Sequence, residues 1–482
     1  MDEYLHNVRS QFEAPLHIDR LLEISKQLQQ ECRDRLQASD ISMLPSYQRS
    51  LPTGEERGDF LALDVGGSTF RIALIRLAGK TKAEHSSTCS ATHTPDTPCR
   101  SDSLQIRRIR TFTIDETVRR LRGEAFFDWM ADRIGDMLHE YNHIRGTSNA
   151  HLPMGLAWSF PIEQTSPHSG RLLAMGKGFL ATHGVENQDL SSLIMRSCRA
   201  KKLNVEMRAI VNDSAATLLA QSYRDSSVRM SLILGTGTNA AVYLPVSSLH
   251  PSKFGDRPES WFSDTTHVLV NTELSMLGKR SLPRTHWDDQ LNASHPLPDF
   301  QPLEYLITGR YLAEIFRLVL LEAEGSIVDF FSLPPAWRTT PYSVDASLLA
   351  IFEADTTPTL SLSRAAILPH YPPDSKTQIL APDLSFLRSI AQSITCRAST
   401  YLATALHALW VVRCEAEGLR PTTDQSRVSV ACAGSIVEKY PGYRQRAQRV
   451  LDELCGVGEC EEGYVRLGCS GESSVVGAAV AV

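Results

Sequence analysis

Two segments with the same strand–turn–strand plan constrain the fold of this chain most. Each unit has an apolar run, a turn rich in glycine and hydroxyl residues, and a second apolar run: 60–65, 66–69 and 71–77, then 230–234, 235–239 and 240–244. Short apolar runs on both sides of a glycine-rich turn predict β-hairpins. Two such hairpins, about 170 residues apart, predict two related lobes that offer their turns to one ligand.

The chemistry of these turns suits a phosphate group. Glycine lets an anion approach the backbone, and successive N–H groups and hydroxyls can then bind it. Either turn alone is equally compatible with an ordinary tight turn, and neither matches the P-loop or dinucleotide-binding patterns. The pair gains meaning beside Asp64 and Asp213, which each follow an apolar run. A buried acid at such a place needs a cation or a proton-transfer role.

Two further candidates each allow a structural interpretation. Asn212, Asp213 and Ser214 lie between a predicted strand and a predicted helix. They could face a ligand, or they could simply cap the helix. Lys177 lies between two glycines and could bind a ligand or be a surface charge. Spacing alone leaves both alternatives open.

The rest of the chain shows ordered segments separated by surface segments. Helical periodicity is present at 18–36, where a helix should stop before Pro45, and at 126–141. Residues 428–431 predict a strand, followed by a turn at Gly434. Residues 78–105 and 332–383 lack periodicity or are rich in proline and threonine, so we expect them on the surface.

Composition excludes several classes of function. With 482 residues, 42% of them hydrophobic, the chain can bury a core large enough for two or more domains. It has neither a membrane-length apolar run nor a signal-peptide pattern, so we expect a cytoplasmic protein without a membrane span. A net charge of −6 without dense basic runs argues against a nucleic-acid partner. Ten scattered cysteines predict reduced thiols.

Six ordered motifs resemble those of the hexokinase family. They are 44–47 with 51–55 and 60–71, 159–161 through 176–179, 211–213, 234–240, 271–273 with 282–285, and 301–304 with 307–309 and 311–312. The resemblance implies an α/β, two-lobed actin-like (ribonuclease-H-like) ATPase fold with a central cleft. It places 57–213 plus 465–482 in a small lobe, and 1–56 plus 214–464 in a large lobe.

The resemblance also implies an activity. A hexokinase-like chain would transfer the γ-phosphoryl group of MgATP to the 6-hydroxyl of a hexose, with Asp213 as the catalytic base and Lys177 neutralising developing charge. The expected sugar-binding residues are Ser159, Phe160, Pro161, Gly176, Lys177, Asn212, Asp213, Asn239, Glu273, Gln301 and Glu304. The expected ATP-binding residues are Asp64, Gly66, Gly67, Ser68, Thr69, Arg71, Gly235, Thr236, Gly237, Thr238, Gly434 and Ser435. Asp64 would hold Mg²⁺ through water, and the protein would be a monomer or weak dimer.

Departures from the family pattern keep the substrate open. Gly176 replaces a threonine, which removes a hydroxyl worth about 1 to 1.5 kcal/mol of binding. Residues 274–277 replace Trp-Gly-Ala-Phe, which should reshape the pocket wall, 297–299 replace Asn-Pro-Gly, and 473–475 replace an adenosine-side Gly-Ser-Gly. Three interpretations follow: a kinase for glucose, fructose or mannose, a kinase for N-acetylglucosamine like a fungal branch of the family, or an inactive regulatory protein that senses sugar.

Overall fold

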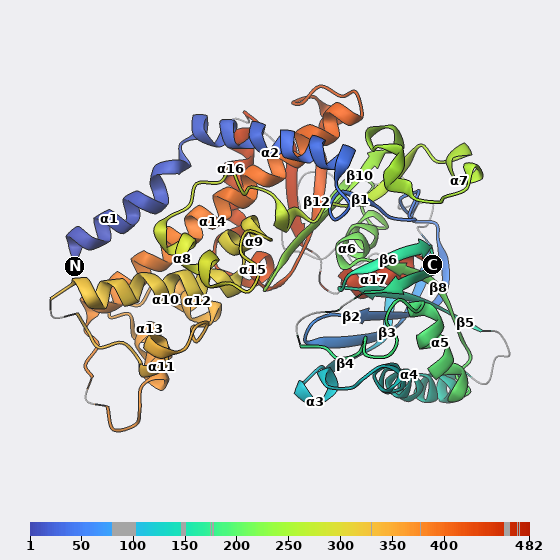
Figure 1. The fold of residues 1–482 in the computed structure, drawn as a ribbon, viewed down its shortest axis with the longest axis horizontal. Coiled ribbons are helices and arrows are strands. Elements are labelled where there is room, and N and C mark those ends of the chain that lie inside the picture. Colours follow the sequence, from blue (N-terminus) through green and yellow to red (C-terminus); the bar gives the residue numbers. More distant parts are fainter. Residues whose placement is uncertain are drawn as a thin grey trace.

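Two β-sheets, each with helices on its outer face, form the framework of the protein (Figure 1). The structure is a computed structural model, and it describes residues 1–79, 103–145, 151–173, 175, 178–328, 330–375, 377–456, 463–469, 471 and 473–482. Each sheet belongs to one lobe. The two predicted hairpins lie in different sheets, so the prediction of two lobes is confirmed for the described residues.

The small-lobe sheet has the strand order β4-β3-β2-β5-β8. The first hairpin, β2 with β3, is antiparallel, whereas β5 and β8 run parallel to β2. The bounds are β2 (Arg57–Val65), β3 (Thr69–Ala78), β4 (Leu104–Thr113), β5 (Leu152–Trp158) and β8 (Val205–Val211). Residues 80–102, most of the predicted surface excursion, lie outside the described residues.

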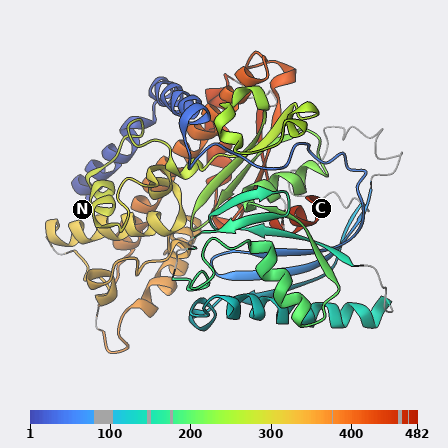
Figure 2. The ribbon, with the colours of Figure 1, turned by 45° about the vertical axis from the view of Figure 1, so that its right-hand side comes forward.

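The outer face of this sheet is covered by α4 (Glu124–Arg145) and α5 (Leu190–Ala200). In Figure 2, α4 runs along the bottom of the view, beneath the strands. Side chains such as Leu61 and Leu63 alternate toward these helices and form one apolar core with Met130. The predicted helix at 126–141 is therefore confirmed, extended at both ends. Smaller elements complete the lobe: α3 (Glu116–Arg119), β6 (Ile162–Ser166) and β7 (Ser169–Leu172).

The large-lobe sheet has the strand order β1-β11-β10-β9-β12-β13. The second hairpin, β9 with β10, is antiparallel, and β12 and β13 extend the sheet in parallel. The bounds are β1 (Leu44–Pro45), β9 (Val228–Leu234), β10 (Thr238–Pro245), β11 (His267–Asn271), β12 (Val428–Ala433) and β13 (Val465–Cys469).

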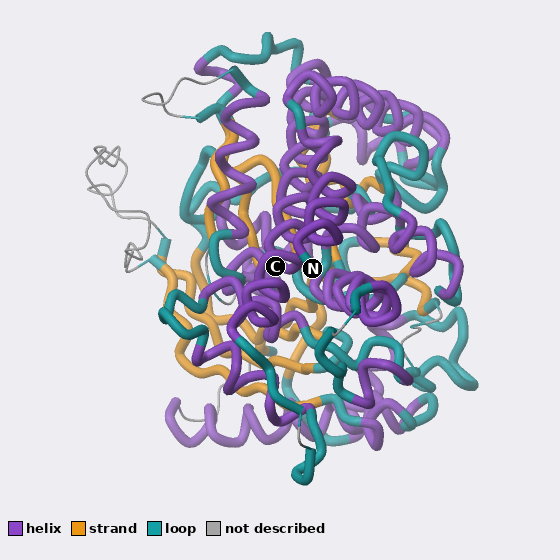
Figure 3. Tube along the Cα trace, turned by 90° about the vertical axis from the view of Figure 1, so that its left-hand side faces the viewer, coloured by secondary structure: helices purple, strands orange, loops and turns teal. Residues whose placement is uncertain are grey.

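Helices gather on the outer side of the large-lobe sheet, and Figure 3 shows them in front of the strands. At their centre, α14 spans 36 residues, and its buried Arg397 Nη2 donates to Asp288 Oδ1 at 2.8 Å. The bounds are α1 (Asp2–Glu13), α2 (Ile18–Ala38), α7 (Glu259–Ser263), α8 (His286–Ser294), α9 (Pro302–Ile307), α10 (Gly309–Ser326), α11 (Pro335–Thr339), α12 (Ala346–Ala354), α13 (Ser361–Ile367), α14 (Ala381–Ala416), α15 (Ser435–Lys439) and α16 (Tyr443–Leu454). Helix α2 ends at Ala38, well before Pro45.

A middle layer of two helices, α6 (Asp213–Ser222) and α17 (Ser473–Val480), joins the lobes. Helix α17 packs on β2, β3 and β5, whereas α6 packs on β9, β10 and β12, and the two helices pack on each other. Their apolar residues form one core with inner-face residues of both sheets. A Cβ atom on Gly477 would lie 1.7 Å from Ala216 O, so only glycine allows this approach of the helices.

The predicted lobe boundary needs one correction. Residues 465–482 were assigned to the small lobe, but β13 pairs in parallel with β12 and forms the edge of the large-lobe sheet. The chain therefore enters the small-lobe side only with α17. The prediction was wrong because the pairing partner of a short strand is set by distant residues rather than by its own sequence.

The close contact at Gly477 gives a stability prediction. We expect Gly477→Ala to lower the free energy of unfolding by about 3 kcal/mol or more, since the new methyl group would overlap backbone atoms of α6. Gly325→Ala is the matched control, because Gly325 is also helical but has open space around it. It should change stability by less than about 1 kcal/mol. Denaturant unfolding of both variants checks this, and equal effects would contradict it.

Candidate active site

The N-terminus of α6 carries Asn212 and Asp213. Asn212 is the N-cap: its Oδ1 accepts from Ser214 N at 2.9 Å and from Ser214 Oγ at 2.6 Å. Asp213 Oδ1 also accepts from Ser214 N, at 2.7 Å. The capping interpretation is therefore confirmed for Asn212. Because the capping bonds fix both side chains at the start of a helix in the middle layer, a ligand would meet them in one set orientation.

Glu273 lies in a network of amides from the large lobe. Asn271 Nδ2 donates to Glu273 Oε1 at 2.8 Å, and Asn239 Nδ2 donates to Asn271 Oδ1 at 2.8 Å and to Glu273 Oε1 at 3.5 Å. Glu273 has a left-handed backbone with φ of 48°, which turns the chain after β11. Asn271 was missing from the predicted site, although its place two residues before Glu273 could have indicated it.

Electrostatics connect Glu273 with Asp213. Burial raises the pKa of Glu273 above its usual value, the hydrogen bond from Asn271 opposes this shift, and the charge of Asp213 adds to it. Two predicted sugar-binding carboxyls from different elements are thus close enough to influence one another. Such pairs of interacting carboxyls are frequent at functional sites.

Glu304 contacts the second glycine-rich turn. Its Oε2 accepts from Thr238 N at 2.9 Å, and a Cβ atom on Gly237 would lie 3.0 Å from the same oxygen. Thr238 is buried, and its hydroxyl donates to Ile233 O at 2.9 Å, so its side chain fixes the turn. Thr236 at the tip is exposed. Gln301, the residue before α9, donates to Ser275 Oγ at 3.4 Å.

Gly434 and Ser435 lie directly against this turn. A Cβ atom on Gly235 would lie 3.5 Å from Ser435 Oγ. Gly434 has φ of 119°, and a Cβ atom there would lie 2.3 Å from Leu234 O. The carboxyl ends of β9 and β12 therefore meet without room for a larger residue.

Asp64 is the buried acid of the small lobe, with 3% of its surface exposed. It pairs in register with Arg71 across the first hairpin, and Arg71 Nη2 lies 2.5 Å from Asp64 Oδ2. Ser474 Oγ donates to the same oxygen at 2.7 Å. Ser474 belongs to the segment predicted on the adenosine side, and its hydroxyl brings the first turn of α17 into contact with the acid.

The surroundings of Asp64 fit a divalent cation. Mg²⁺ prefers oxygen ligands and keeps most of its waters, so one or two carboxylates and substrate phosphates suffice. Both contacts described for Asp64 fall on Oδ2. Among the described residues, no group of three or more His, Cys, Asp or Glu side chains could hold a metal. A cation bound here would have Asp64 as a carboxylate ligand, with waters and phosphate oxygens as the other ligands.

Arg119 connects the first turn with the predicted sugar loop. Its Nη2 donates to Gly67 O at 3.0 Å, and its guanidinium lies 5.8 Å from the centre of the Phe179 ring. Gly66 N donates to Thr69 O at 3.0 Å within the turn, and Ser68 is exposed at its tip. Sequence reasoning missed Arg119, because only the fold brings it to Gly67.

The sugar loop is described in part. Ser159 N donates to Val65 O at 3.1 Å, and Pro161 is exposed. Phe160 is 4% exposed and packs between Trp158 and Phe179, with ring centres 5.2 and 4.9 Å apart, so it supports the loop from the core. The predicted residues Gly176 and Lys177 lie outside the described residues.

The substituted segment 274–277 does not form an exposed wall. Leu274 and Leu277 are both 0% exposed and belong to the core of the large lobe. The prediction of a reshaped pocket wall is therefore wrong for these two leucines. In the segment 297–299, Leu297 is 55% exposed, and Asp299 Oδ1 accepts from Arg284 Nη1 at 3.1 Å.

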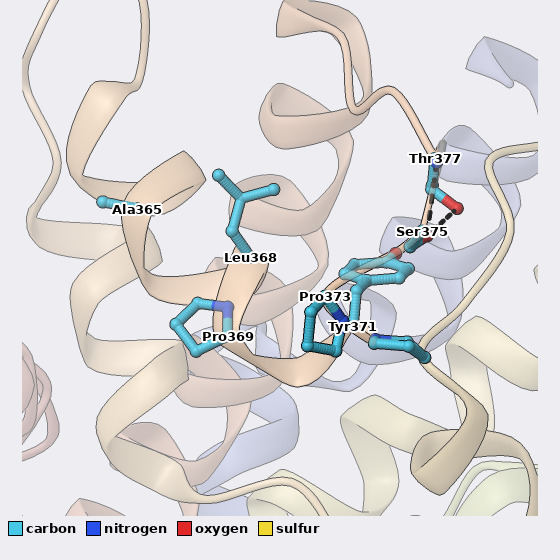
Figure 4. A pocket seen from close by; sticks show the side chains of 8 residues that line it. Ala365, Leu368, Pro369, Tyr371, Pro373, Ser375 and Thr377 are labelled. Atoms are coloured by element: carbon cyan, nitrogen blue, oxygen red, sulfur yellow. Dashed lines mark hydrogen bonds between the residues drawn. The ribbon is translucent and has the colours of Figure 1, made fainter.

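A hollow on the helical lobe lies apart from these residues. Residues of the segment after α13, including Leu368, Tyr371 and Pro373, line it (Figure 4), and it contains none of the predicted sugar or ATP residues. Among the described helices, none has the length and apolar character needed to cross a bilayer.

Known proteins share this sequence and fold. Two family models, both described as hexokinase, match residues 5–223 and 229–482. The chain therefore belongs to the hexokinase family and is a sugar phosphotransferase of the kind that uses ATP with a divalent metal. A hexokinase of Schwanniomyces occidentalis is 28% identical over 420 residues, covering 87% of this chain and 79% of that protein. Hexokinase-1 of Saccharomyces cerevisiae is 27% identical over 444 residues, covering 92% and 83%.

Solved structures agree with the fold. The hexokinase from Schistosoma mansoni complexed with glucose superimposes with a TM-score of 0.75 and 24% identity, covering 100% of this chain and 99% of that one. A second hexokinase crystal structure gives a TM-score of 0.74 with 25% identity, covering 99% of each chain. The predicted two-lobed actin-like fold is confirmed.

The raised pKa of Glu273 gives a pH-dependent prediction. A carboxyl whose pKa is higher in the folded protein binds its proton more tightly there, so its contribution to stability is lost as pH rises from the unfolded pKa through the folded one. We expect Glu273→Gln to make the sugar-free protein more resistant to unfolding near about pH 8, with the gain fading toward about pH 4. The exposed carboxyl of α16 supplies the control, Glu453→Gln. Denaturation curves across this range measure both, and a gain that grows on acidification would contradict the assignment.

Proposed function

We propose that this protein is an ATP-dependent hexose kinase that transfers the γ-phosphoryl group of MgATP to the 6-hydroxyl of a hexose. The observation that supports it most is the middle layer. Asp213 begins α6, Ser474 at the start of α17 holds Asp64, and α6 and α17 touch at Gly477. A candidate base and a candidate metal carboxylate are thereby tied to one helix pair, which suits a reaction that depends on positioning.

In this proposal Asp213 accepts the proton of the 6-hydroxyl as its oxygen attacks the γ-phosphorus. The neighbouring Glu273 would accept hydrogen bonds from other sugar hydroxyls, since Asn271 and Asn239 orient its carboxyl. Lys177 would neutralise charge on the transferring group. General-base catalysis of this kind contributes about 10²- to 10⁴-fold in rate.

The nucleotide would bind between the two glycine-rich turns. Their exposed tips, Ser68 and Thr236, would offer hydroxyls and backbone N–H groups to phosphate. Asp64 and water would hold Mg²⁺, which neutralises phosphate charge when bound. Glu304 joins the sugar side to the second turn through Thr238 N, so sugar binding and phosphate position would be coupled.

Turnover assays test the function and rank the sugars. Purified protein with MgATP should release ADP with at least one of glucose, fructose, mannose, glucosamine and N-acetylglucosamine. N-acetylglucosamine as the best substrate would support the altered-preference alternative. No ADP release with any of the five sugars, in protein shown to be folded, would overturn the kinase proposal in favour of a regulatory sugar-binding protein.

The base assignment makes a mutational prediction. Asp213→Ala should lower kcat by about 10²-fold or more while changing sugar affinity by less than about tenfold, since the base acts in the transition state. Asp128→Asn, at an exposed carboxylate of α4, is the control and should leave both unchanged. Steady-state kinetics measure kcat, and calorimetric titration with sugar measures the affinity of both variants. Undiminished turnover in Asp213→Ala would refute the assignment.

The glycine at position 176 makes a second mutational prediction, on sugar affinity. If this residue contacts sugar, Gly176→Thr should raise glucose affinity up to about tenfold by restoring a hydroxyl donor. Calorimetric titration with glucose checks this. An unchanged dissociation constant would show that the missing hydroxyl does not set the preference.

A further inference from the structure

Two cysteines face each other across the outermost strand pair of the large-lobe sheet. Cys432 on β12 and Cys469 on β13 are register partners in a parallel ladder, so their side chains lie on the same face of the sheet. Cys432 alternates with Val428 and Val430 into the large-lobe core, and Cys469 packs against that core. Cys432 Sγ donates to Val430 O at 3.5 Å and Cys469 Sγ to Val437 O at 3.9 Å, each thiol shifts the pKa of the other, and neither cysteine is in a disulfide.

The spacing of these strands suits a disulfide. Neighbouring strands lie about 4.8 Å apart. Disulfide-linked residues have Cα atoms about 4.4 to 6.8 Å apart, with an S–S bond of about 2.05 Å. Side chains on register partners lie about one strand spacing apart, whereas a disulfide needs Cβ atoms about 3.8 Å apart, so the bond would draw the ends of β12 and β13 together.

The two cysteines differ in environment. Cys432 is 1% exposed, whereas Cys469 is half-buried. The neighbouring Cys432 thiol lowers the pKa of the Cys469 thiol, burial opposes this, and the guanidinium of Arg444 on α16 lowers it further. A thiol that is partly accessible and beside a cation is the kind that peroxides oxidise.

A second pair of neighbouring cysteines lacks these features. Cys414 at the end of α14 and Cys455 after α16 influence each other electrostatically and are both buried. Burial raises their pKa values to about 11 and about 12. They form no strand pair, so they serve as an internal control.

The position of the strand pair gives an oxidation a consequence. Parallel strands end at the same edge of a sheet, so β9, β12 and β13 all end on the side of the second glycine-rich turn. Cys432 is two residues before Gly434, which has no spare room against Leu234. Cys469 precedes α17, where Ser474 holds Asp64. A covalent link between these strand ends would therefore displace candidate nucleotide residues.

We propose that Cys432 and Cys469 form a dithiol site that hydrogen peroxide oxidises to a disulfide, and that this disulfide lowers phosphoryl transfer. Cys469 takes one oxygen atom from the peroxide to become a sulfenic acid, and water leaves. The Cys432 sulfur then attacks the Cys469 sulfur, the S–S bond forms, and a second water leaves. The two sulfurs lose two electrons in total, which reduce one peroxide. The effect on activity rests on the proposed kinase function, whereas the oxidation itself does not.

The experiment treats the reduced full-length protein with equimolar hydrogen peroxide. Free thiols are then alkylated, and peptides are mapped by mass spectrometry, with turnover measured on the same samples. We expect a Cys432–Cys469 linked peptide and a drop in turnover of about tenfold or more, since small displacements of reacting groups are costly. Dithiothreitol should restore both the thiols and the turnover.

Variants make the result decisive. Cys469→Ser should keep its turnover after peroxide treatment, and Cys432→Ala replaces it if Cys469→Ser folds poorly. Cys414→Ser should lose turnover like the wild type. Absence of the linked peptide would overturn the dithiol site, whether or not the protein turns over sugar. A linked peptide with unchanged turnover in an active kinase would overturn the regulatory part. A linked peptide in a protein without kinase activity would confirm the oxidation and reject the proposed function instead.

Discussion

The contact between α6 and α17 is the constraint on which the rest of the structure depends. Ala216 O and Gly477 approach so closely that a single methyl group would not fit between them, and Gly155 accepts Ala478 in the same way. These small residues let two helices share one layer between two sheets. Because α17 packs mainly on the small-lobe sheet and α6 mainly on the large-lobe sheet, this contact links the two lobes.

The same layer organises the polar residues. The N-terminus of α6 presents Asn212 and Asp213, and the N-terminus of α17 presents Ser474 to Asp64. Networks from the lobes then approach these helix ends: Asn271 and Asn239 hold Glu273, and Arg119 holds the first turn. Most of these contacts are charge-assisted or capping hydrogen bonds, which hold each side chain in one orientation as well as stabilising it. The arrangement suits a reaction whose rate depends on alignment of two substrates.

Local patterns predicted the parts of the structure that local physics determines. Both hairpins were predicted because short apolar runs and glycine-rich turns determine a hairpin within a few residues. The strands in the structure extend beyond the predicted runs by only a few positions. The capping role of Asn212 was one of two interpretations and is confirmed.

Non-local contacts set the limits of that prediction. Ser474 meets Asp64 across 410 residues of sequence, and β13 finds β12 only through the assembled sheet. Leu274 and Leu277 lie in the core because of helices that pack over them, which their own pattern does not indicate. Arg119 gains its contact with Gly67 only from the fold, so a pattern search passed over it, whereas Asn271 lay inside a recognised motif without being assigned to the site.

The central claim is that the two turns and the carboxyls Asp64 and Asp213 act as one site around the helix pair. A crystal structure with hexose, Mg²⁺ and a non-hydrolysable ATP analogue tests it most directly. The account predicts the sugar 6-hydroxyl within hydrogen-bond reach of the Asp213 carboxylate. It also predicts phosphates between Ser68 and Thr236, and the metal on the side of Asp64. A nucleotide bound away from both turns, or a sugar that does not reach Asp213, would contradict it.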